Sequence, residues 1–242
     1  YDPFTDPWTG NKGVFAEEPV VISSPRSSGL VLADMRGKAW DDPLWETYLN
    51  QIDFSEDALW QMLLTASGQT AAVEALGKPR SVDLDGPQGI CAGRRSTKET
   101  YAYCAQVLLG ATFHPELAYA FGQSIGNEAL MIGLTGWYGP GVNIHRSAFC
   151  GRNFEYYSED PLLSGKLASS CISGAASRGV LSYMKHFALN NYEGPATCLT
   201  VWATEQAIRE IYLRSFEIAV KEASCELLYY ENDSVDLSRK TM

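Results

Sequence analysis

Charged residues gathered in three short motifs are the part of this sequence that could do chemistry. Asp85 lies in the first motif, Arg152 lies in the second, and Lys185 and His186 open the third. A carboxylate accepts hydrogen bonds, whereas guanidinium and ammonium groups donate them, and such charge-assisted bonds are stronger than neutral ones. A ligand that both donates and accepts hydrogen bonds, such as one that carries a ring of hydroxyls, would suit this combination. We therefore predict that these four residues bind one ligand together.

The segments that must position these motifs alternate between strand and helix patterns. Apolar and β-branched runs predict strands over residues 81–85, 136–144, 180–187 and 227–230. Apolar residues at helical spacing predict helices over residues 115–133, 161–178 and 203–223. This alternation is typical of a parallel βα architecture, whose chemistry lies on the loops after the carboxyl ends of the strands. Because the motifs follow predicted strand ends, we expect them to meet on one face of the fold.

The first 55 residues differ from the rest of the chain. Prolines and glycines predominate at the start, and only residues 19–22 and 29–32 look like strands. A short helix is predicted to begin at residues 41–46, and a clearer helix at Ser55. We therefore divide the chain into an irregular lead-in segment, residues 1–55, and a βα domain, residues 56–242.

The composition limits the classes of partner. With 19 basic and 29 acidic residues the chain carries a net charge of -10, which repels phosphate backbones and anionic lipid surfaces. We expect no nucleic-acid partner and no membrane partner. Six cysteines occur singly along the chain, so we predict no metal site. Scattered cysteines suit a reducing compartment, and we favour the cytoplasm; secretion stays open because a leader can precede Tyr1.

Together the motifs resemble the sugar-binding face of glycoside hydrolase family 3 enzymes of the β-glucosidase type. The resemblance covers residues 32–223 and is densest over residues 137–221, where GPGVNIHR (139–146) and WATEQAIRE (202–210) also follow the family pattern. It implies a (β/α)8 TIM-barrel fold and retaining hydrolysis of terminal β-linked glucose or a similar sugar, without a cofactor. The implied ligand is a small β-glucoside or oligosaccharide.

The resemblance also implies roles for individual residues. It makes Asp85, Arg152, Lys185 and His186 the ligands of the sugar at the non-reducing end. Glu155 and Asp160 resemble supports for the loop of Arg152, although a place at a helix start is the alternative for both. Trp137 and Tyr138 could stack on a sugar face, but we favour core packing for them.

Several positions depart from the family pattern. Ala196 stands near the place of a further substrate-facing arginine, and residues 231–233 read Glu-Asn-Asp where the family usually has Ser-Tyr-Asn. The family nucleophile is an aspartate in a Ser/Thr-Asp-Trp setting, which neither Asp233 nor Asp236 matches, and its acid/base residue belongs to a separate sandwich domain. The resemblance therefore implies no catalytic residue in this chain.

About five predicted strands imply a partial barrel rather than a closed one. Self-association or a companion domain would cover its open edge. Two alternatives stay open. One is a noncatalytic carbohydrate-binding or assembly protein derived from the same barrel, and the other is an unrelated βα barrel enzyme. A Ser/Thr-Asp-Trp segment and a sandwich domain in the parent gene would separate the hydrolase from the first alternative.

Overall fold

The computed structural model describes residues 26–53, 68–91, 99–192 and 201–223. These residues form a mixed α/β fold around an open four-stranded sheet with the strand order β1-β2-β3-β4. Strands β2 (Ser81–Asp85), β3 (Gly136–Tyr138) and β4 (Leu181–Ser182) are parallel, and β1 (Gln69–Thr70) pairs with β2 in the antiparallel sense. The register places Asp85, the last residue of β2, beside Tyr138 of β3.

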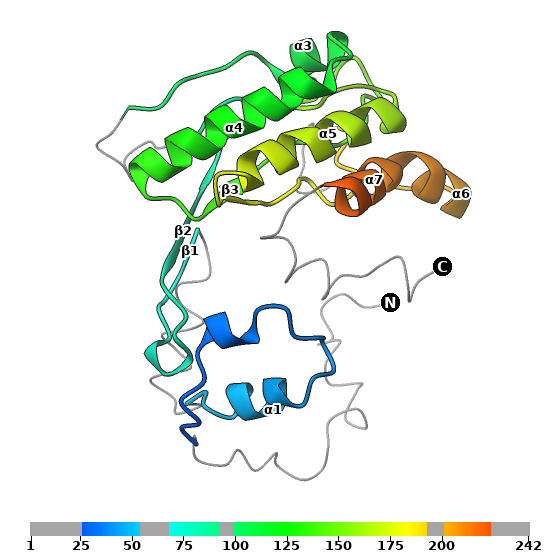
Figure 1. Ribbon diagram of the computed structural model, residues 1–242. Coiled ribbons are helices and arrows are strands. Elements are labelled where there is room, and N and C mark those ends of the chain that lie inside the picture. Colours follow the sequence, from blue (N-terminus) through cyan, green and yellow to red (C-terminus); the bar gives the residue numbers. More distant parts are fainter. Residues whose placement is uncertain (1–25, 54–67, 92–98, 193–200, 224–242) are drawn as a thin grey trace, which may run out of the picture.

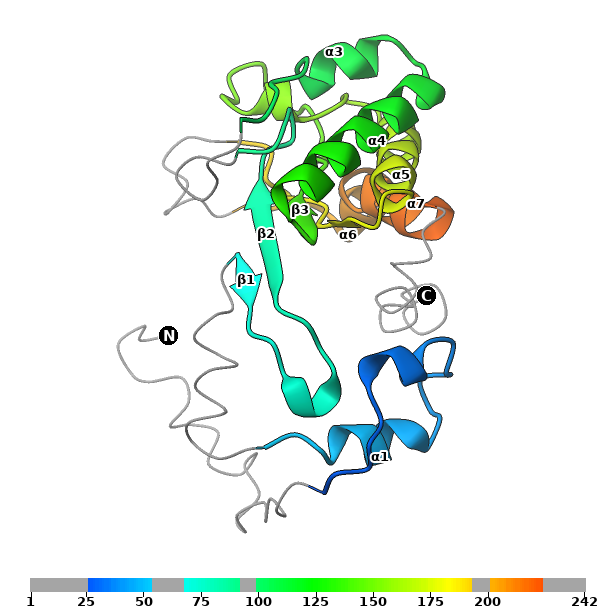
Figure 2. The ribbon, with the colours of Figure 1, turned by 60° about the vertical axis from the view of Figure 1, so that its left-hand side comes forward.

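Helices α4 (Pro115–Ile132) and α5 (Pro161–Ala176) connect the parallel strands. Each begins with a proline that follows a capping residue: the His114 ring accepts a hydrogen bond from Leu117 N, and the Asp160 carboxylate accepts one from Leu162 N at 2.8 Å. These local signals explain why both predicted helices are confirmed. Figures 1 and 2 show α4, α5 and α7 (Arg214–Glu222) side by side along one face of the sheet.

The main core lies between these helices and the strands. Its buried apolar residues include Leu84 and Trp137 from the sheet and Phe121, Ile125, Leu167, Ile172 and Phe216 from the helices. Helices α4 and α5 approach very closely, because a Cβ at Gly122 would lie 1.9 Å from Cys171 O and one at Gly174 would lie 2.1 Å from Tyr119 O. Only glycine permits this backbone contact.

A second apolar cluster joins the lead-in segment to the turn between β1 and β2. The 3-10 helix η2 (Leu32–Met35), helix α1 (Leu44–Leu49) and the 3-10 helix η3 (Glu74–Leu76) bury Met35, Tyr48 and Leu76 against one another. Both ribbon views show α1 near the far end of the segment that joins β1 and β2 (Figures 1 and 2). The domain boundary after residue 55 stays a prediction, since residues 54–67 lie outside the described ones.

Some predicted elements differ from the structure. The strand predicted at residues 29–32 is wrong, because Leu32 begins η2, and β1 was not predicted since it has only two residues. The strands predicted at 136–144 and 180–187 are shorter in the structure and end at Tyr138 and Ser182. Gly139-Pro140 follows Tyr138 directly and interrupts the ladder between them. The strand predicted at 227–230, like the helix at Ser55, lies outside the described residues.

The helix predicted at residues 203–223 is present but is not continuous. It consists of α6 (Glu205–Ala207), the π-helical turn η7 (Ile208–Tyr212) and α7. Leu213 N donates to Ile208 O at 2.8 Å, a bond across five residues. In the described part of the chain, no helix is long and apolar enough to cross a membrane. Helix α3 (Gln106–Ala111), which the sequence patterns did not indicate, precedes α4.

Candidate sugar-binding site

The end of β2 positions Asp85 through the backbone that follows it. Cys91 N donates to Asp85 O at 2.7 Å, and Gly86 N donates to the Asp85 carboxylate at 2.7 Å. The indole of Trp137 donates to Gly86 O at 2.8 Å. Trp137 is fully buried in the main core, so the expectation of core packing is confirmed for it. The core thus holds the turn that presents Asp85.

A short 3-10 helix positions Arg152. Arg152 directly precedes η5 (Asn153–Glu155), so Glu155 follows it by three residues and lies on the same side of the turn. The guanidinium donates from Nε to Glu155 Oε1 at 2.5 Å and from Nη2 to Glu155 Oε2 at 2.8 Å. The buried Glu155 carboxylate therefore supports Arg152. Asp160 instead caps α5, so for Asp160 the alternative role at a helix start is the correct one.

Backbone pairing beyond β4 positions Lys185. Lys185 N donates to Pro140 O at 3.1 Å, and Val142 N donates to Lys185 O at 2.8 Å. The Lys185 ammonium forms an ion pair with Asp85 and lies 3.8 Å from Glu155 Oε2. Lys185 therefore links the motif of Asp85 to the motif of Arg152.

His186 completes the cluster, and its neighbours fix its tautomer. Arg152 Nη2 lies 2.9 Å from His186 Nε2 and can only donate, so Nε2 accepts. The ring proton then resides on Nδ1 and is donated to Tyr156 Oη at 3.0 Å. Burial, together with the nearby cations Arg152 and Lys185, lowers the pKa of His186 to about 4. The imidazole is therefore neutral at neutral pH.

Tyr156 is a neutral member of the same network. It is fully buried, and this burial raises the pKa of its hydroxyl well above the ordinary value. Its oxygen also accepts a hydrogen bond from Asn190 Nδ2 at 3.2 Å. Tyr156 and Asn190 are site residues that the sequence reasoning missed, although both lie inside the motifs that it singled out.

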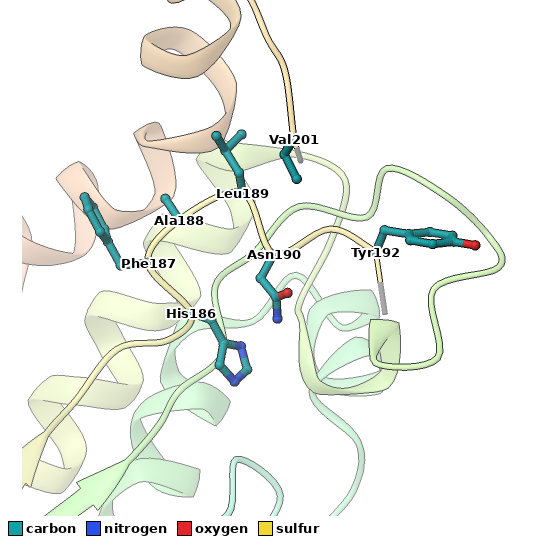
Figure 3. Close-up of a pocket in the computed structure, with 7 residues that line it drawn as sticks. All are labelled: His186, Phe187, Ala188, Leu189, Asn190, Tyr192 and Val201. Carbon is teal, nitrogen blue, oxygen red and sulfur yellow. The ribbon is translucent and has the colours of Figure 1, made fainter. Parts of the chain in front are cut away.

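A cavity of about 400 Å³ lies beside His186. Its lining is His186, Phe187, Ala188, Leu189, Asn190, Tyr192 and Val201. Figure 3 shows the His186 ring and the Asn190 amide pointing the same way, with Leu189 and Val201 side by side above them. Phe187 points away and packs edge-to-face on Phe216, with ring centroids 5.3 Å apart. The cavity thus has a polar wall that belongs to the cluster and an apolar wall.

The structure brings all four predicted side chains together from three separate loops. With Glu155, which supports Arg152, the cluster offers two fixed cations, two carboxylates and one neutral imidazole, which suits a ligand rich in hydroxyl groups. Its two carboxylates, Asp85 and Glu155, both contact cations. Among the described residues, no group of three or more histidines, cysteines or acids could hold a metal ion. The positions of Ala196, Asp233 and Asp236 lie outside the described residues.

Comparison with known proteins connects this cluster to a family. Residues 54–229 match the model described as the glycosyl hydrolase family 3 N terminal domain. Beta-glucosidase A of Butyrivibrio fibrisolvens is 44% identical over 149 residues, which are 62% of this chain and 18% of that protein. The chain spans about a fifth of the length of the curated relatives it matches.

Solved structures show the same relationship. Beta-glucosidase 3B from Thermotoga neapolitana, solved in complex with glucose, matches with a TM-score of 0.60 and 43% identity over 65% of this chain and 23% of that one. A beta-glucosidase from Paenibacillus barengoltzii matches with a TM-score of 0.69 and 32% identity over 84% of this chain and 23% of that one.

Proposed function

Because this chain belongs to glycosyl hydrolase family 3, we propose that its cluster of Asp85, Arg152, Lys185 and His186 binds the terminal sugar of a β-glucoside. The chain is related to the β-glucosidases of that family. The described strands and helices are then part of a (β/α)8 barrel, and a companion segment or a second chain covers the open edge of the sheet. The glucose in the Thermotoga neapolitana structure supports this choice of sugar.

One observation carries the proposal: three loops that are distant in sequence meet through charged contacts. Lys185 pairs with Asp85 across 100 residues, and Arg152 contacts His186 across 34. Asp85 is 62% exposed, so its carboxylate can accept bonds from sugar hydroxyls. Lys185, which pairs with Asp85, and Arg152 supply donors to other hydroxyls of the same ring.

The implied reaction of the whole protein is retaining hydrolysis, which uses two carboxyl groups about 5 to 5.5 Å apart, one as nucleophile and one as acid/base. We assign neither role to Asp85 or Glu155, because each contacts a cation. The catalytic carboxylates then lie outside the described residues, and the reaction needs no cofactor. We expect the purified chain to bind glucose but not to hydrolyse an aryl β-glucoside.

Because Asp85 and Glu155 both contact cations, a second candidate is a noncatalytic carbohydrate-binding protein. The two candidates agree on glucose binding and differ in the parent gene. A Ser/Thr-Asp-Trp segment with a sandwich domain in the full reading frame supports the hydrolase. A reading frame with neither supports the binding protein.

Calorimetric titration of glucose, or of a glucose-like inhibitor, into the full chain tests the proposal. Asp85→Ala removes the acceptor, and a charged hydrogen bond contributes about 1.5 to 3 kcal/mol, so Kd rises about 10- to 150-fold. Glu222→Ala is the matched control, because Glu222 also forms an exposed ion pair, with Lys166 at 2.7 Å, but on α7. Equal affinity in Asp85→Ala and the parent chain would refute the role of Asp85.

A further inference from the structure

The buried side chain of Asn143 makes two hydrogen bonds to the backbone of a single residue of the cluster. Its Nδ2 donates to His186 O at 2.9 Å, and its Oδ1 accepts from His186 N at 2.6 Å. Asn143 is 1% exposed, so water does not compete for either bond. Resting on the proposed sugar-binding function, we infer that Asn143 is a positioning residue, which fixes the His186 backbone and thereby places the Lys185 and His186 side chains for the ligand.

The reason for such a residue lies in the backbone ladder. After β3 and β4 end, an isolated bridge pairs Lys185 with Gly141: Lys185 N donates to Pro140 O, and Val142 N donates to Lys185 O. At His186 the partner of both backbone groups is the Asn143 side chain. The Asn143 side chain thus continues the contact between the two segments beyond the last backbone bridge, at the residue where the wall of the cavity begins. A rotation at either side of His186 breaks at least one of the two bonds.

Asn143 is itself held in place by its neighbours. Ser215 of α7 donates to Val142 O at 2.8 Å, and Asn191 Nδ2 donates to Ile144 O at 2.7 Å. Both contacts anchor the backbone on either side of Asn143, and neither touches His186. These contacts fix the backbone of Asn143, and the Asn143 side chain in turn fixes the backbone of His186.

The chemistry of the contact requires an amide. Asparagine offers one donor and one acceptor on the same planar group, which match the carbonyl and the N–H of His186. An aspartate of the same shape keeps the acceptor but turns a second oxygen toward His186 O, so one bond is lost and two acceptors face each other. An alanine loses both bonds and leaves the N–H and the carbonyl of His186 without these partners.

Asn143→Asp and Asn143→Ala test the inference, with Gln51→Glu as the matched control. Gln51 is also a buried amide that accepts a hydrogen bond from a backbone N–H, Ser28 N, and donates one to a backbone carbonyl, Leu30 O, but it lies in the lead-in segment. The first measurement is the NMR titration of the His186 ring, which is simple to assign because the chain has three histidines. In both Asn143 variants the midpoint moves up from about 4 toward 6.5 by at least one pH unit, since the ring leaves Arg152 and Tyr156. In Gln51→Glu the midpoint does not move.

The second measurement is the Kd for glucose. It rises at least tenfold in both Asn143 variants and stays within twofold in Gln51→Glu. Unchanged His186 titration in both variants overturns the inference, as does a shifted titration with unchanged affinity, which would make the contact structural only. If Asn143→Ala does not fold, the isosteric Asn143→Asp decides. A parent chain that binds no glucose refutes the proposed function instead, while the NMR titration still tests the contact.

Discussion

The Glu155 carboxylate lies beside both cations of the cluster. The substitution Glu155→Gln removes its negative charge and measures what that charge contributes to stability. Arg152 donates to both of its oxygens, from Nε to one and from Nη2 to the other, and Lys185 lies 3.8 Å away. Glutamine keeps one acceptor. Its NH2 group faces the remaining guanidinium donor, so one charged donor loses its partner and two cations lose their nearest shared anion.

The expected loss of stability follows from these contacts. Removing one partner of a fully buried ion pair costs about 3 to 5 kcal/mol, and a lost charged hydrogen bond costs about 1.5 to 3 kcal/mol. Arg152 is 31% exposed and Lys185 keeps Asp85, so water and the second carboxylate compensate in part. We expect a loss of about 2 to 3 kcal/mol, which lowers Tm by about 4 to 12 °C for a domain of this size.

Thermal unfolding of the full chain at pH 7 measures this effect, and Asp160→Asn is the control. The control makes the same carboxylate-to-amide change five residues along the chain, on an exposed cap that asparagine fills equally well. Its Tm should stay within about 2 °C of the parent value, since most surface changes remain within about 0.5 kcal/mol. Equal Tm values for Glu155→Gln and Asp160→Asn would show that Glu155 does not hold the cluster.

Two further predictions concern pH and packing. The pKa of His186 is lowered to about 4 in the folded chain, so the unfolded chain takes up a proton below about pH 6.5 while the folded chain does not. The stabilisation is complete above about pH 6.5 and decreases as the pH falls toward 4; for a half-buried group we expect a loss of about 1 kcal/mol between pH 7 and pH 5. Urea unfolding at the two pH values measures it, and the same loss in His186→Gln would contradict this account. Gly122→Ala should destabilise the chain by about 1 to 3 kcal/mol, because its Cβ would lie 1.9 Å from Cys171 O. Gly151→Ala, where no atom lies within 4 Å, should change stability by less than about 0.5 kcal/mol, and similar melting of both variants would refute the packing argument.

Features that depend on neighbouring residues were predictable from the sequence. Pro115 and the Asp160-Pro161 pair mark helix starts within a few residues, and the helices begin there. The end of β2 at Asp85 and the composition of the cluster were predictable as well, because motif and strand pattern coincide there. These signals depend on residues close together in the chain, so a single sequence is enough to predict them.

Features that depend on contacts between distant residues were not predictable. The bonds of Asn143 to His186 cross 43 residues, and no spacing rule indicates them. Glu155 and Asp160 are alike in sequence, but Glu155 is buried and pairs with Arg152, whereas Asp160 is exposed and caps α5. The π-helical turn at Ile208–Tyr212 preserves an apolar pattern that a continuous helix would also show. Tertiary contacts decide each of these cases.

The close contact between α4 and α5 has a consequence for mutational scanning. At Gly122 and Gly174 the obstacle to any side chain is the backbone of the partner helix, which cannot move aside as a side chain can. Every substitution at these two positions should therefore score as damaging in a library selected for sugar binding, although both lie on helices that carry none of the four cluster residues. An assay that reports the amount of folded chain separately from ligand binding would assign them to folding and leave Asp85 and its neighbours as the functional positions.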